Sequence, residues 1–391
     1  MVQWKAVLPL LIFYLLVFYE ERASTPSCVV VPQGGVQEAV GDDPEDLKVM
    51  VVANLLLLGS KAGYLNLFFR DFYLSKFFKK SFASLKPDML LVLGDISAEG
   101  SDLTRSEWIP VLHQFRRMLG PFLALPFYVI LGDRDVGECN QLNAKSVYWV
   151  AKNFPGLDSA GCGAFEVSNI SFVSLNAVAL LCGNNGLRFS VEKVIERESI
   201  DLQMDIEGTT EELNELKKFG ETSHNLEWRE NAMSSGSGPV LLLHFPLHHT
   251  SNCSGDGVPT RSYNSLFERT EIPGSRQLVG TGPYELLHTL PPNATEYIFQ
   301  ALRPRIVFSA HSHRFCDRTH PDGTREVTVP AMTWNAGDDP GFVVATFRKN
   351  RGAVIISHCS LARESHILIA YISLLILFMS MIFVAKQTQH I

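Results

Sequence analysis

The sequence has little that would support a cysteine-based metal site or nucleic-acid binding. Its seven cysteines lack any Cys-x-x-Cys spacing, which argues against a thiolate metal site. The net charge is −7 and the chain contains no basic block, so nucleic acid is not an expected partner. No internal repeat is visible. With 391 residues and 46% apolar content, the chain can instead bury one large core, in a domain of about 300 residues.

Four apolar runs, each long enough for a strand, end in side chains that can bind a metal ion. His311 and His313 follow the run Pro304 to Ala310. The other runs are Asp88 to Leu93 before Asp95, Pro126 to Leu131 before Asp133 and Asp135, and Val240 to Leu243 before His244. Because open α/β sheets keep their ligands at the carboxyl ends of strands, we expect these side chains to converge. Carboxylate and imidazole suit Mn, Fe or Zn.

Each residue also has a purely structural interpretation. A lone Asp at a strand end is most often a turn residue, and Asp133 with Asp135 could close an Asx-type turn around Arg134. His244, before Phe245 and Pro246, could be a hydrogen-bonded core histidine. The coincidence of all four runs in one chain is what favours a metal site.

The order of these motifs resembles the calcineurin-like metallophosphoesterases over roughly Lys48 to Phe347. That family has Asp-x-His, then Gly-Asp-x-x-Asp, Gly-Asn-His-Asp/Glu, a single His and finally Gly-His-x-His. Within it the chain is most similar to the membrane-anchored phosphodiesterases that remodel glycosylphosphatidylinositol (GPI) anchors, including the yeast cell-division-cycle member. The segments that carry this likeness are Leu93 to Gly100, Phe172 to Ala179, Leu243 to Leu247 and Asn252 to Gly255, with an apolar segment at each end.

The resemblance implies a role for each matching residue. Asp95 would bridge two metal ions, and Asp133 stands at the family's ligating Asn. His244 and His311 would complete the shell of one ion, whereas His313 would reach toward the other. One metal shell is therefore expected to be complete.

The second shell departs from the family pattern. After the strand Lys48 to Val52, Asn54 occupies the carboxylate position and Leu56 the imidazole position. Asn54 can offer one neutral oxygen, and Leu56 can offer nothing. The family's His of Gly-Asn-His is Arg134, which can hold a phosphate but cannot usefully release a proton, and the second Asp of Gly-Asp-x-x-Asp is Ala98. One or two ions are thus both compatible with the sequence.

Apolar segments at both ends predict membrane association. Ala6 to Tyr19 is short for a span and equally typical of a signal peptide, so residues 1–25 are either an anchor or a leader. Ile367 to Ala385 is uncharged and long enough to cross a bilayer, and a buried soluble helix is the less favoured alternative. Lys386 would remain on the cytoplasmic side, leaving a catalytic domain at residues 45–360 in the lumen of the endoplasmic reticulum or Golgi.

Sequons and cysteines agree with a lumenal domain. Asn169, Asn252 and Asn293 each begin an Asn-x-Ser/Thr glycosylation sequon. In an oxidising lumen some cysteines should pair, and the odd count leaves at least one outside an internal disulfide.

The expected fold is α/β, a two-sheet sandwich flanked by helices, as the resemblance also implies. Helices are predicted at Leu65 to Leu85 and Leu103 to Met118, between strands with a parallel part. The first is either a solvated helix packed on the sheet or a basic helix at a membrane surface. Residues 164–175 predict a hairpin, and 182–239 a polar insertion. Strands near Glu326 to Val329, Phe342 to Phe347 and Ala353 to His358 are predicted for a second sheet.

The leading functional hypothesis is a membrane-tethered, metal-dependent phosphodiesterase of the secretory pathway. Its ion would be divalent, with Mn favoured over Zn or Fe, and Asp95 and Arg134 would be the catalytic residues. The resemblance implies ethanolamine phosphate on a GPI-anchor glycan as substrate. The alternative is a catalytically impaired lumenal binding or scaffold module, motivated by Asn54, Leu56, Ala98 and Arg134. A soluble secreted phosphatase is disfavoured by the segment 367–385.

Overall fold

Two compact units make up the part of the chain that the computed structural model describes, which is residues 4–32, 46–182, 186–201, 238–249, 253, 289–348 and 354–387. Each unit is built around its own six-stranded sheet. The first unit comprises Met1–Val129 and Pro330–Ile391, and the second comprises Ile130–Val329. The domain boundaries expected at 1–25, 45–360 and 367–385 stay predictions.

The first unit contains a mixed sheet with the strand order β1-β12-β11-β2-β3-β4. Its strands are β1 (Ser27–Val31), β2 (Leu47–Val52), β3 (Met89–Leu93), β4 (Phe127–Ile130), β11 (Gly341–Phe347) and β12 (Val354–Ser360). β2 and β3 are parallel and buried, as predicted for strands joined by a helical crossover. This parallel pair brings the loops after Val52 and Leu93 to the same edge of the sheet.

One strand assignment was wrong. The segments Phe342 to Phe347 and Ala353 to His358 were expected in the second sheet, but β11 pairs antiparallel with β2 and β12 pairs with β11 in the first. A buried central strand needs hydrogen-bond partners along both edges, and β3 covers only one edge of β2. The segment Glu326 to Val329 does join the second sheet, as β10 (Arg325–Thr328) beside β8 (Ile306–Ser309).

The helices of the first unit agree with the sequence pattern. The π-helical turn η2 (Asn66–Arg70) leads into α2 (Asp71–Leu85), and α3 (Arg105–Leu119) follows β3. Thr104 caps α3 by accepting from the backbone of Glu107, whose own side chain accepts from Thr104 N. Short 3-10 helices are η1 (Gly59–Lys61), η3 (Gly100–Asp102) and η4 (Gly120–Ala124).

The second unit also contains a mixed sheet, with the order β5-β6-β7-β8-β10-β9. The strands not yet named are β5 (Gly163–Val167), β6 (Ile170–Ser174), β7 (Val240–Leu242) and β9 (Cys316–Thr319). β6, β7, β8 and β10 run parallel, and the edge strands are antiparallel. The predicted hairpin is confirmed as β5–β6, whose two turn residues, Ser168 and Asn169, have φ of 52° and 60°.

Helices accompany this second sheet. They are α4 (Asp133–Val136), α5 (Ala144–Ala151), α6 (Ala177–Leu181) and α9 (Pro292–Leu302). Of the predicted polar insertion at 182–239, residues 186–201 are helical, whereas 202–237 lie outside the described residues. The two mixed sheets and their flanking helices confirm the α/β fold class.

Three disulfides join distant parts of the chain, one in the first unit and two in the second. Cys28–Cys359 links β1 to β12, whereas Cys139–Cys182 and Cys253–Cys316 lie in the second unit. Cys162 is buried and free, as the odd cysteine count requires.

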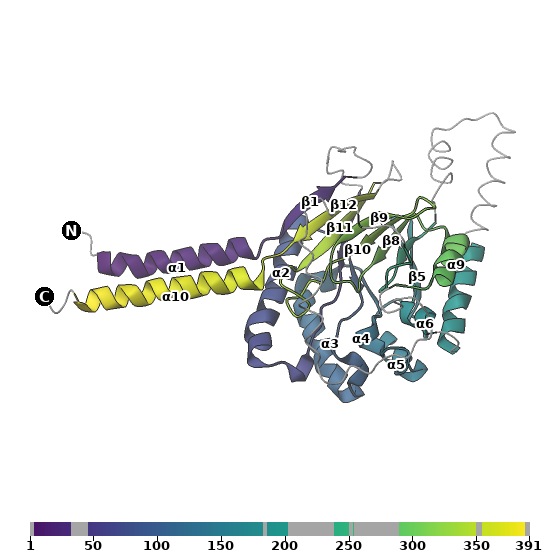
Figure 1. The fold of residues 1–391 in the computed structure, drawn as a ribbon, viewed down its shortest axis with the longest axis horizontal. Helices are drawn as coiled ribbons and strands as arrows, with labels where there is room; N and C mark the ends of the chain where they lie inside the picture. Colours follow the sequence, from purple (N-terminus) through teal and green to yellow (C-terminus); the bar gives the residue numbers. More distant parts are fainter. Residues whose placement is uncertain are drawn as a thin grey trace, which may run out of the picture. The chain divides into compact units, whose positions relative to one another are not determined.

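The terminal helices α1 (Trp4–Ala23) and α10 (Glu364–Gln387) lie side by side in the first unit, as Figure 1 shows. The hydroxyl of Tyr19 donates to the carbonyl of His366 near their shared end. By length and composition, Glu364–Phe383 could cross a membrane, and most of it is exposed. A single helix of this kind is weak support for membrane anchoring, so the span stays a prediction.

Candidate metal centre

Two parallel strands of the second unit position two imidazoles. His244 follows β7, and His311 follows β8, which is hydrogen-bonded to β7. The pairing continues beyond the strands, because Leu243 N donates to Phe308 O at 2.9 Å and Ala310 N donates to His244 O at 2.9 Å. The backbone therefore fixes both histidines at neighbouring strand ends, where the sequence pattern placed them.

Asp133, at the start of α4, completes a cluster with these histidines. One carboxylate oxygen, Oδ1, lies 3.0 Å from His244 Nε2 and 3.2 Å from His311 Nδ1. All three potential ligand atoms lie within 4.8 Å of one another. The two imidazole rings meet edge to face, with centroids 5.4 Å apart, and Phe245 packs against His311 at 4.1 Å. His244 is fully buried, whereas Asp133 and His311 keep some exposed surface.

The electrostatics of the cluster favour an ionised carboxylate. Burial raises the pKa of Asp133, but hydrogen bonds and charge from His244 and His311 outweigh this effect and hold the pKa well below its usual range. The Asp133 carboxylate is therefore ionised at neutral pH and can act as an anionic ligand. A hydrogen-bonded core histidine at position 244 would make the same contact with Asp133. The identification of a metal site therefore rests on the whole donor set.

The donor set fits a divalent ion. Ligands about 2.1 Å from one ion, in tetrahedral or octahedral arrangement, are separated from each other by roughly 3.0 to 3.4 Å. The distances of 3.0 and 3.2 Å from the Asp133 oxygen to the two imidazole nitrogens agree with this spacing. One carboxylate and two imidazoles suit Mn, Fe or Zn, in keeping with the sequence-based expectation.

His313 and Arg134 belong to the same electrostatic environment. Burial, together with positive charge from His311, Arg134 and His244, lowers the pKa of His313 to about 4, and the Asp133 carboxylate opposes this shift. His313 is therefore neutral at neutral pH and can offer a lone pair. Arg134 is exposed in α4, directly after Asp133.

Backbone conformation at the strand ends is unusual. His311 and His313 have φ of 63° and 60°, in the left-handed region that non-glycine residues rarely adopt. Such residues cluster at functional sites, where the surrounding structure holds them in place.

Asp133 and Asp135 have different roles. The buried Asp135 carboxylate accepts from Gly132 N at 3.1 Å, so it closes the turn that begins α4. The side chain of Asp133 is directed instead at the two histidines. The turn-residue alternative thus applies to Asp135 alone.

The first unit holds the remaining predicted site residues on the loops after β2 and β3. Asn54 and Asp95 are buried, and Asn54 N donates to Gly94 O at 3.1 Å while Leu56 N donates to Asp95 O at 3.0 Å. Asn54, Leu56 and Asp95 have φ of 52°, 50° and 53°. Leu56 therefore keeps a left-handed backbone that costs a leucine about 1–2 kcal/mol, although its side chain cannot bind a metal ion. The roles predicted for Asp95, Asn54 and His313 as ligands remain untested predictions.

The sequence matches the family description "Calcineurin-like phosphoesterase" over residues 68–315, more than half of the chain. The chain belongs to this family. It is therefore a phosphoester hydrolase, and its family and donor set imply divalent metal ions. The match includes Asp95, Asp133, His244, His311 and His313, and it begins after Asn54 and Leu56.

Related proteins cover nearly the whole phosphoesterase chain. Metallophosphoesterase 1 of Rattus norvegicus is 28% identical over 364 residues, covering 92% of this chain and 81% of the relative. Metallophosphoesterase 1 of Danio rerio is 23% identical over 335 residues, covering 85% and 80%. Among solved structures, a dimetal phosphatase from Danio rerio has 13% identity and a TM-score of 0.48, covering 81% of this chain and 97% of the other.

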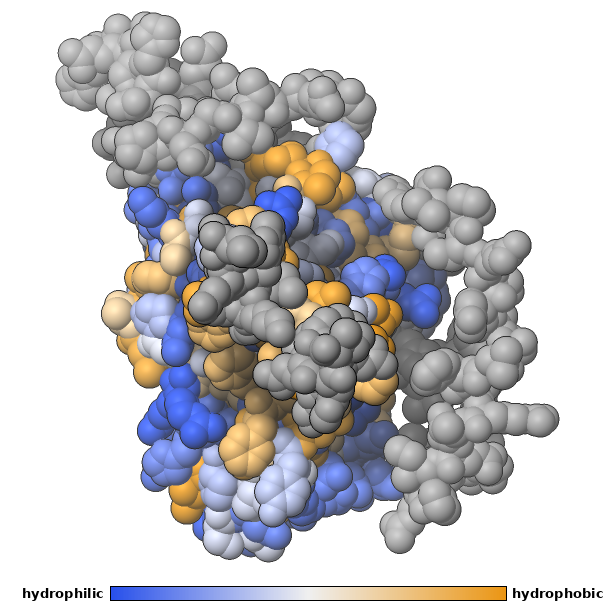
Figure 2. Space-filling view, turned by 90° about the vertical axis from the view of Figure 1, so that its left-hand side faces the viewer, coloured by the Kyte–Doolittle hydropathy of each residue, from blue (hydrophilic) through white to orange (hydrophobic). Residues whose placement is uncertain are grey.

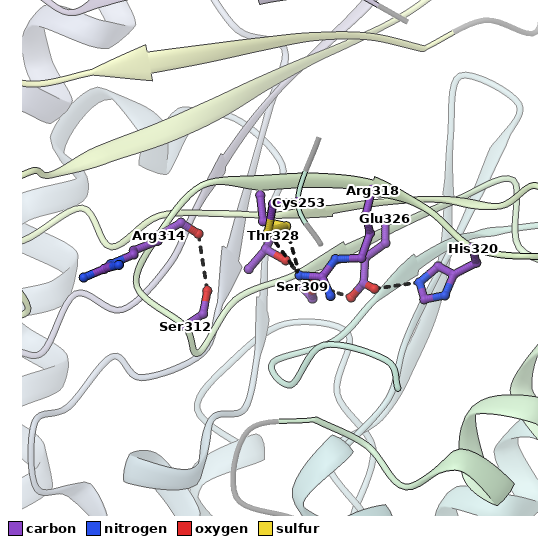
Figure 3. The surroundings of a disulfide bond; sticks show 9 residues. Cys253, Ser309, Ser312, Arg314, Arg318, His320, Glu326 and Thr328 are labelled. Carbon is purple, nitrogen blue, oxygen red and sulfur yellow. Dashed lines mark hydrogen bonds and ion pairs between the residues drawn. A yellow bond between two sulfur atoms is a disulfide. The ribbon is translucent and has the colours of Figure 1, made fainter. Parts of the chain in front are cut away.

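Glu326, which sequence reasoning missed, lies behind the metal centre of the phosphoesterase. This carboxylate on β10 is fully buried. Its Oε1 accepts from Leu247 N at 3.1 Å and from Ser309 Oγ at 2.7 Å, and its Oε2 lies 2.7 Å from His320 Nε2. Figure 3 shows the carboxylate between Ser309 and the His320 ring. Because Leu247 follows His244 by three residues and Ser309 precedes His311 by two, Glu326 ties together the segments that carry both imidazoles.

Glu326→Gln should therefore weaken metal binding by about 10- to 100-fold, the usual cost of disturbing groups that orient ligands. The amide keeps the shape but loses the charge and one acceptor oxygen. Competition with a fluorescent chelator would measure the metal affinity, alongside the thermal midpoint of unfolding.

Asp317→Asn provides the matched control for Glu326→Gln. Asp317 is a buried carboxylate on the neighbouring strand β9, where it pairs with Arg325 at 2.7 Å. Among the described residues, its side chain does not bond to the segments that carry His244 and His311. Its variant should lower the thermal midpoint while leaving metal affinity unchanged. Equal metal affinity in Glu326→Gln and wild type would contradict the assigned role.

Proposed function

We propose that the chain is a membrane-tethered phosphodiesterase of the secretory pathway that depends on a divalent ion, with Mn the favoured metal. Its proposed substrate is ethanolamine phosphate on a GPI-anchor glycan. The observation that carries the proposal is the convergence of Asp133, His244 and His311 at the strand ends of a calcineurin-like phosphoesterase. The choice of substrate rests on the resemblance of the sequence to GPI-remodelling phosphodiesterases.

Different residues of the centre would bind the ion, bind the phosphoryl oxygens and position the imidazoles. Asp133, His244 and His311 would hold the ion, which supplies Lewis acidity to a phosphoryl oxygen and to the attacking water. Arg134, exposed beside Asp133, can form two parallel hydrogen bonds to phosphoryl oxygens and balance the charge that develops on them. Glu326 keeps the two imidazoles in position from behind the site.

The location is supported by features at the chain ends and on the surface. An exposed apolar α10 of sufficient length would tether the domain at the membrane face where a lipid-linked glycan lies. Three disulfides agree with an oxidising lumen. Asn169, in the β5–β6 turn, and Asn293, in the first turn of α9, are exposed as glycosylation requires, whereas Asn252 lies outside the described residues.

A second candidate is a binding or scaffold module with impaired catalysis. Leu56 favours it, because this buried apolar side chain stands where the family pattern has an imidazole. A retained single-ion centre would still bind a phosphodiester without rapid turnover.

Arg134→Ala separates these candidates. We expect it to lower phosphodiester turnover by about 10²- to 10³-fold, as for the loss of one donor to transition-state charge, with metal content unchanged. Arg116→Ala, which removes an exposed arginine from α3, is the control and should leave turnover unchanged. Turnover of a chromogenic phosphodiester by the purified full chain, with metal analysis on the same sample, checks both values.

The substrate needs its own assay. A GPI glycan that carries ethanolamine phosphate, incubated with the full chain in detergent, should lose the mass of one such group. Hydrolysis of the chromogenic diester without this loss would retain the phosphodiesterase and overturn the substrate. Metal binding with no turnover of either compound would favour the binding module.

A further inference from the structure

An aromatic stripe runs along the solvent-facing side of the first helix of the core. Tyr64 just before η2, Phe68 within η2 and Phe72 in α2 follow one another at four-residue spacing, which places them on one face. Their side chains are 86%, 69% and 52% exposed. Leu65 and Leu67 beside them are exposed as well.

The side chains of the stripe are not part of the buried core of the first unit. The aromatic side chains that α2 buries within the first unit are others, Tyr73, Phe77 and Phe78. The rings of Tyr64 and Phe68 instead stack on each other, with centroids 6.2 Å apart, in the solvent. Contiguous exposed apolar side chains of this kind are characteristic of a surface that contacts a partner or a membrane.

The helix that carries the stripe is fixed to the last turn of α1 and to the first residue of α10. Lys76 and Lys80, four and eight residues after Phe72, contact Glu20 and Glu21 at the end of α1, with a Lys76–Glu20 distance of 2.7 Å. Because residues four apart share a helix face, Phe72 lies on the side of α2 that meets α1.

A second set of contacts fixes the start of the stripe to α10. Arg70 donates through Nε and Nη2 to both carboxylate oxygens of Glu364, the first residue of α10, at 2.8 and 2.9 Å. Its Nη1 donates to Asn335 Oδ1 at 2.8 Å. A bidentate pair with a third anchor holds the helix in one orientation relative to the beginning of the candidate span.

The direction of α2 suits a membrane surface. In Figure 1, α2 runs crosswise to the neighbouring helices α1 and α10. Figure 2 views the molecule from the side on which these two helices project, and apolar residues are exposed there next to hydrophilic ones. If α10 crosses the bilayer, a helix that runs crosswise to it, as α2 does, lies along the bilayer plane.

We propose that the stripe of Tyr64, Phe68 and Phe72, with Leu65 and Leu67, inserts into the headgroup boundary of the membrane that α10 spans, an inference that rests on the proposed tethering. Aromatic rings are favoured at this depth, where one end of the side chain is apolar and the other is hydrated. Lys79, exposed seven residues after Phe72, adds positive charge toward anionic headgroups. The stripe would thus hold the first unit flat against the membrane.

Spin labelling of the full chain in bilayer nanodiscs tests this insertion. Phe68→Cys carries the label, in nanodiscs of phosphatidylcholine with a minor share of phosphatidylserine. Cys162 is buried, and burial raises the pKa of its thiol to about 12, so it should not react. We expect the ratio of oxygen to nickel-chelate accessibility at Phe68 to exceed the ratio at a water-exposed site several-fold.

Phe189→Cys supplies that water-exposed reference, because Phe189 is 59% exposed in the second unit. A water-like ratio at Phe68, equal to that at Phe189, would falsify the insertion. Low accessibility to both reagents at Phe68 would show a protein partner or second copy on the stripe and would also overturn it.

Phe378→Cys, within α10, distinguishes failure of the tethering from failure of the stripe. A label there should be open to oxygen and closed to the nickel chelate if α10 spans the bilayer. A deep Phe378 with a water-like Phe68 would leave the tethering intact and remove the stripe from the membrane. An oxygen-favoured Phe68 with a water-like Phe378 would support insertion of the stripe and reject the span.

Discussion

Asp133→Ala is expected to remove the tightly bound metal ion and to lower phosphodiester hydrolysis by more than about a hundredfold. Changes to groups behind a metal ligand already cost 10- to 100-fold, and Asp133 supplies the oxygen at which both imidazoles point. His244, which is fully buried, would also lose the contact of its Nε2 with Asp133 at 3.0 Å. The free energy of unfolding should therefore fall by about 1–3 kcal/mol.

Metal analysis and steady-state kinetics on the same preparation would measure both effects. Asp102→Ala, which removes an exposed carboxylate from η3, is the control and should keep wild-type metal content and activity. Full metal content in Asp133→Ala would mean that Asp133, His244 and His311 form a structural hydrogen-bond network. That is the interpretation of His244 as a hydrogen-bonded core histidine.

The strand-end residues could be predicted from sequence because their signal is local. An apolar run followed by Asp or His gives both the element and the position of the side chain, and parallel pairing of β7 and β8 then brings His244 and His311 together. Asp133 was identified in the same way, although the sequence alone did not divide its role from that of Asp135.

Glu326 could not be found by this route. It lies within β10, where alternation along Arg325 to Thr328 gives no sign that both faces are buried. Its partners Leu247 and Ser309 are distant in sequence, and only the tertiary fold brings them to one carboxylate. A charged residue inside a short strand is the single available signal, and it also occurs on exposed strands.

The sequence pattern also could not show which sheet the strands outside the parallel part would join. The strand β11 is buried along almost its whole length and β12 is mostly half-buried, so neither pattern indicates which sheet edge these strands join. The open edge of β2 decides this, together with the Cys28–Cys359 bridge that links β12 to β1. The disulfide connectivity itself follows from the folded positions of the cysteines.

Wild-type protein should bind close to one tightly held metal ion per chain, and the double variant Asn54→Asp with Leu56→His should bind a second. Both residues lie on the loop that runs beside Asp95, since Leu56 N donates to Asp95 O at 3.0 Å. The backbone at both positions already has the left-handed conformation, so the new side chains need no rearrangement of the loop. A carboxylate and an imidazole would then stand next to an existing carboxylate, in place of a neutral amide and an apolar chain.

Burial sets the cost of this restoration. Asn54 and Leu56 are almost fully buried, so the apo double variant should lose about 1–3 kcal/mol of unfolding free energy, which added metal should recover. Leu57→His, one position further in the same buried loop, is the control and should lose stability without gaining metal. Metal content and thermal unfolding with and without Mn²⁺ would measure these outcomes. Two tightly held ions in wild type would show that Leu56 does not empty the second shell, whereas activity that appears only in the double variant would identify the natural chain as a binding module on a phosphoesterase fold.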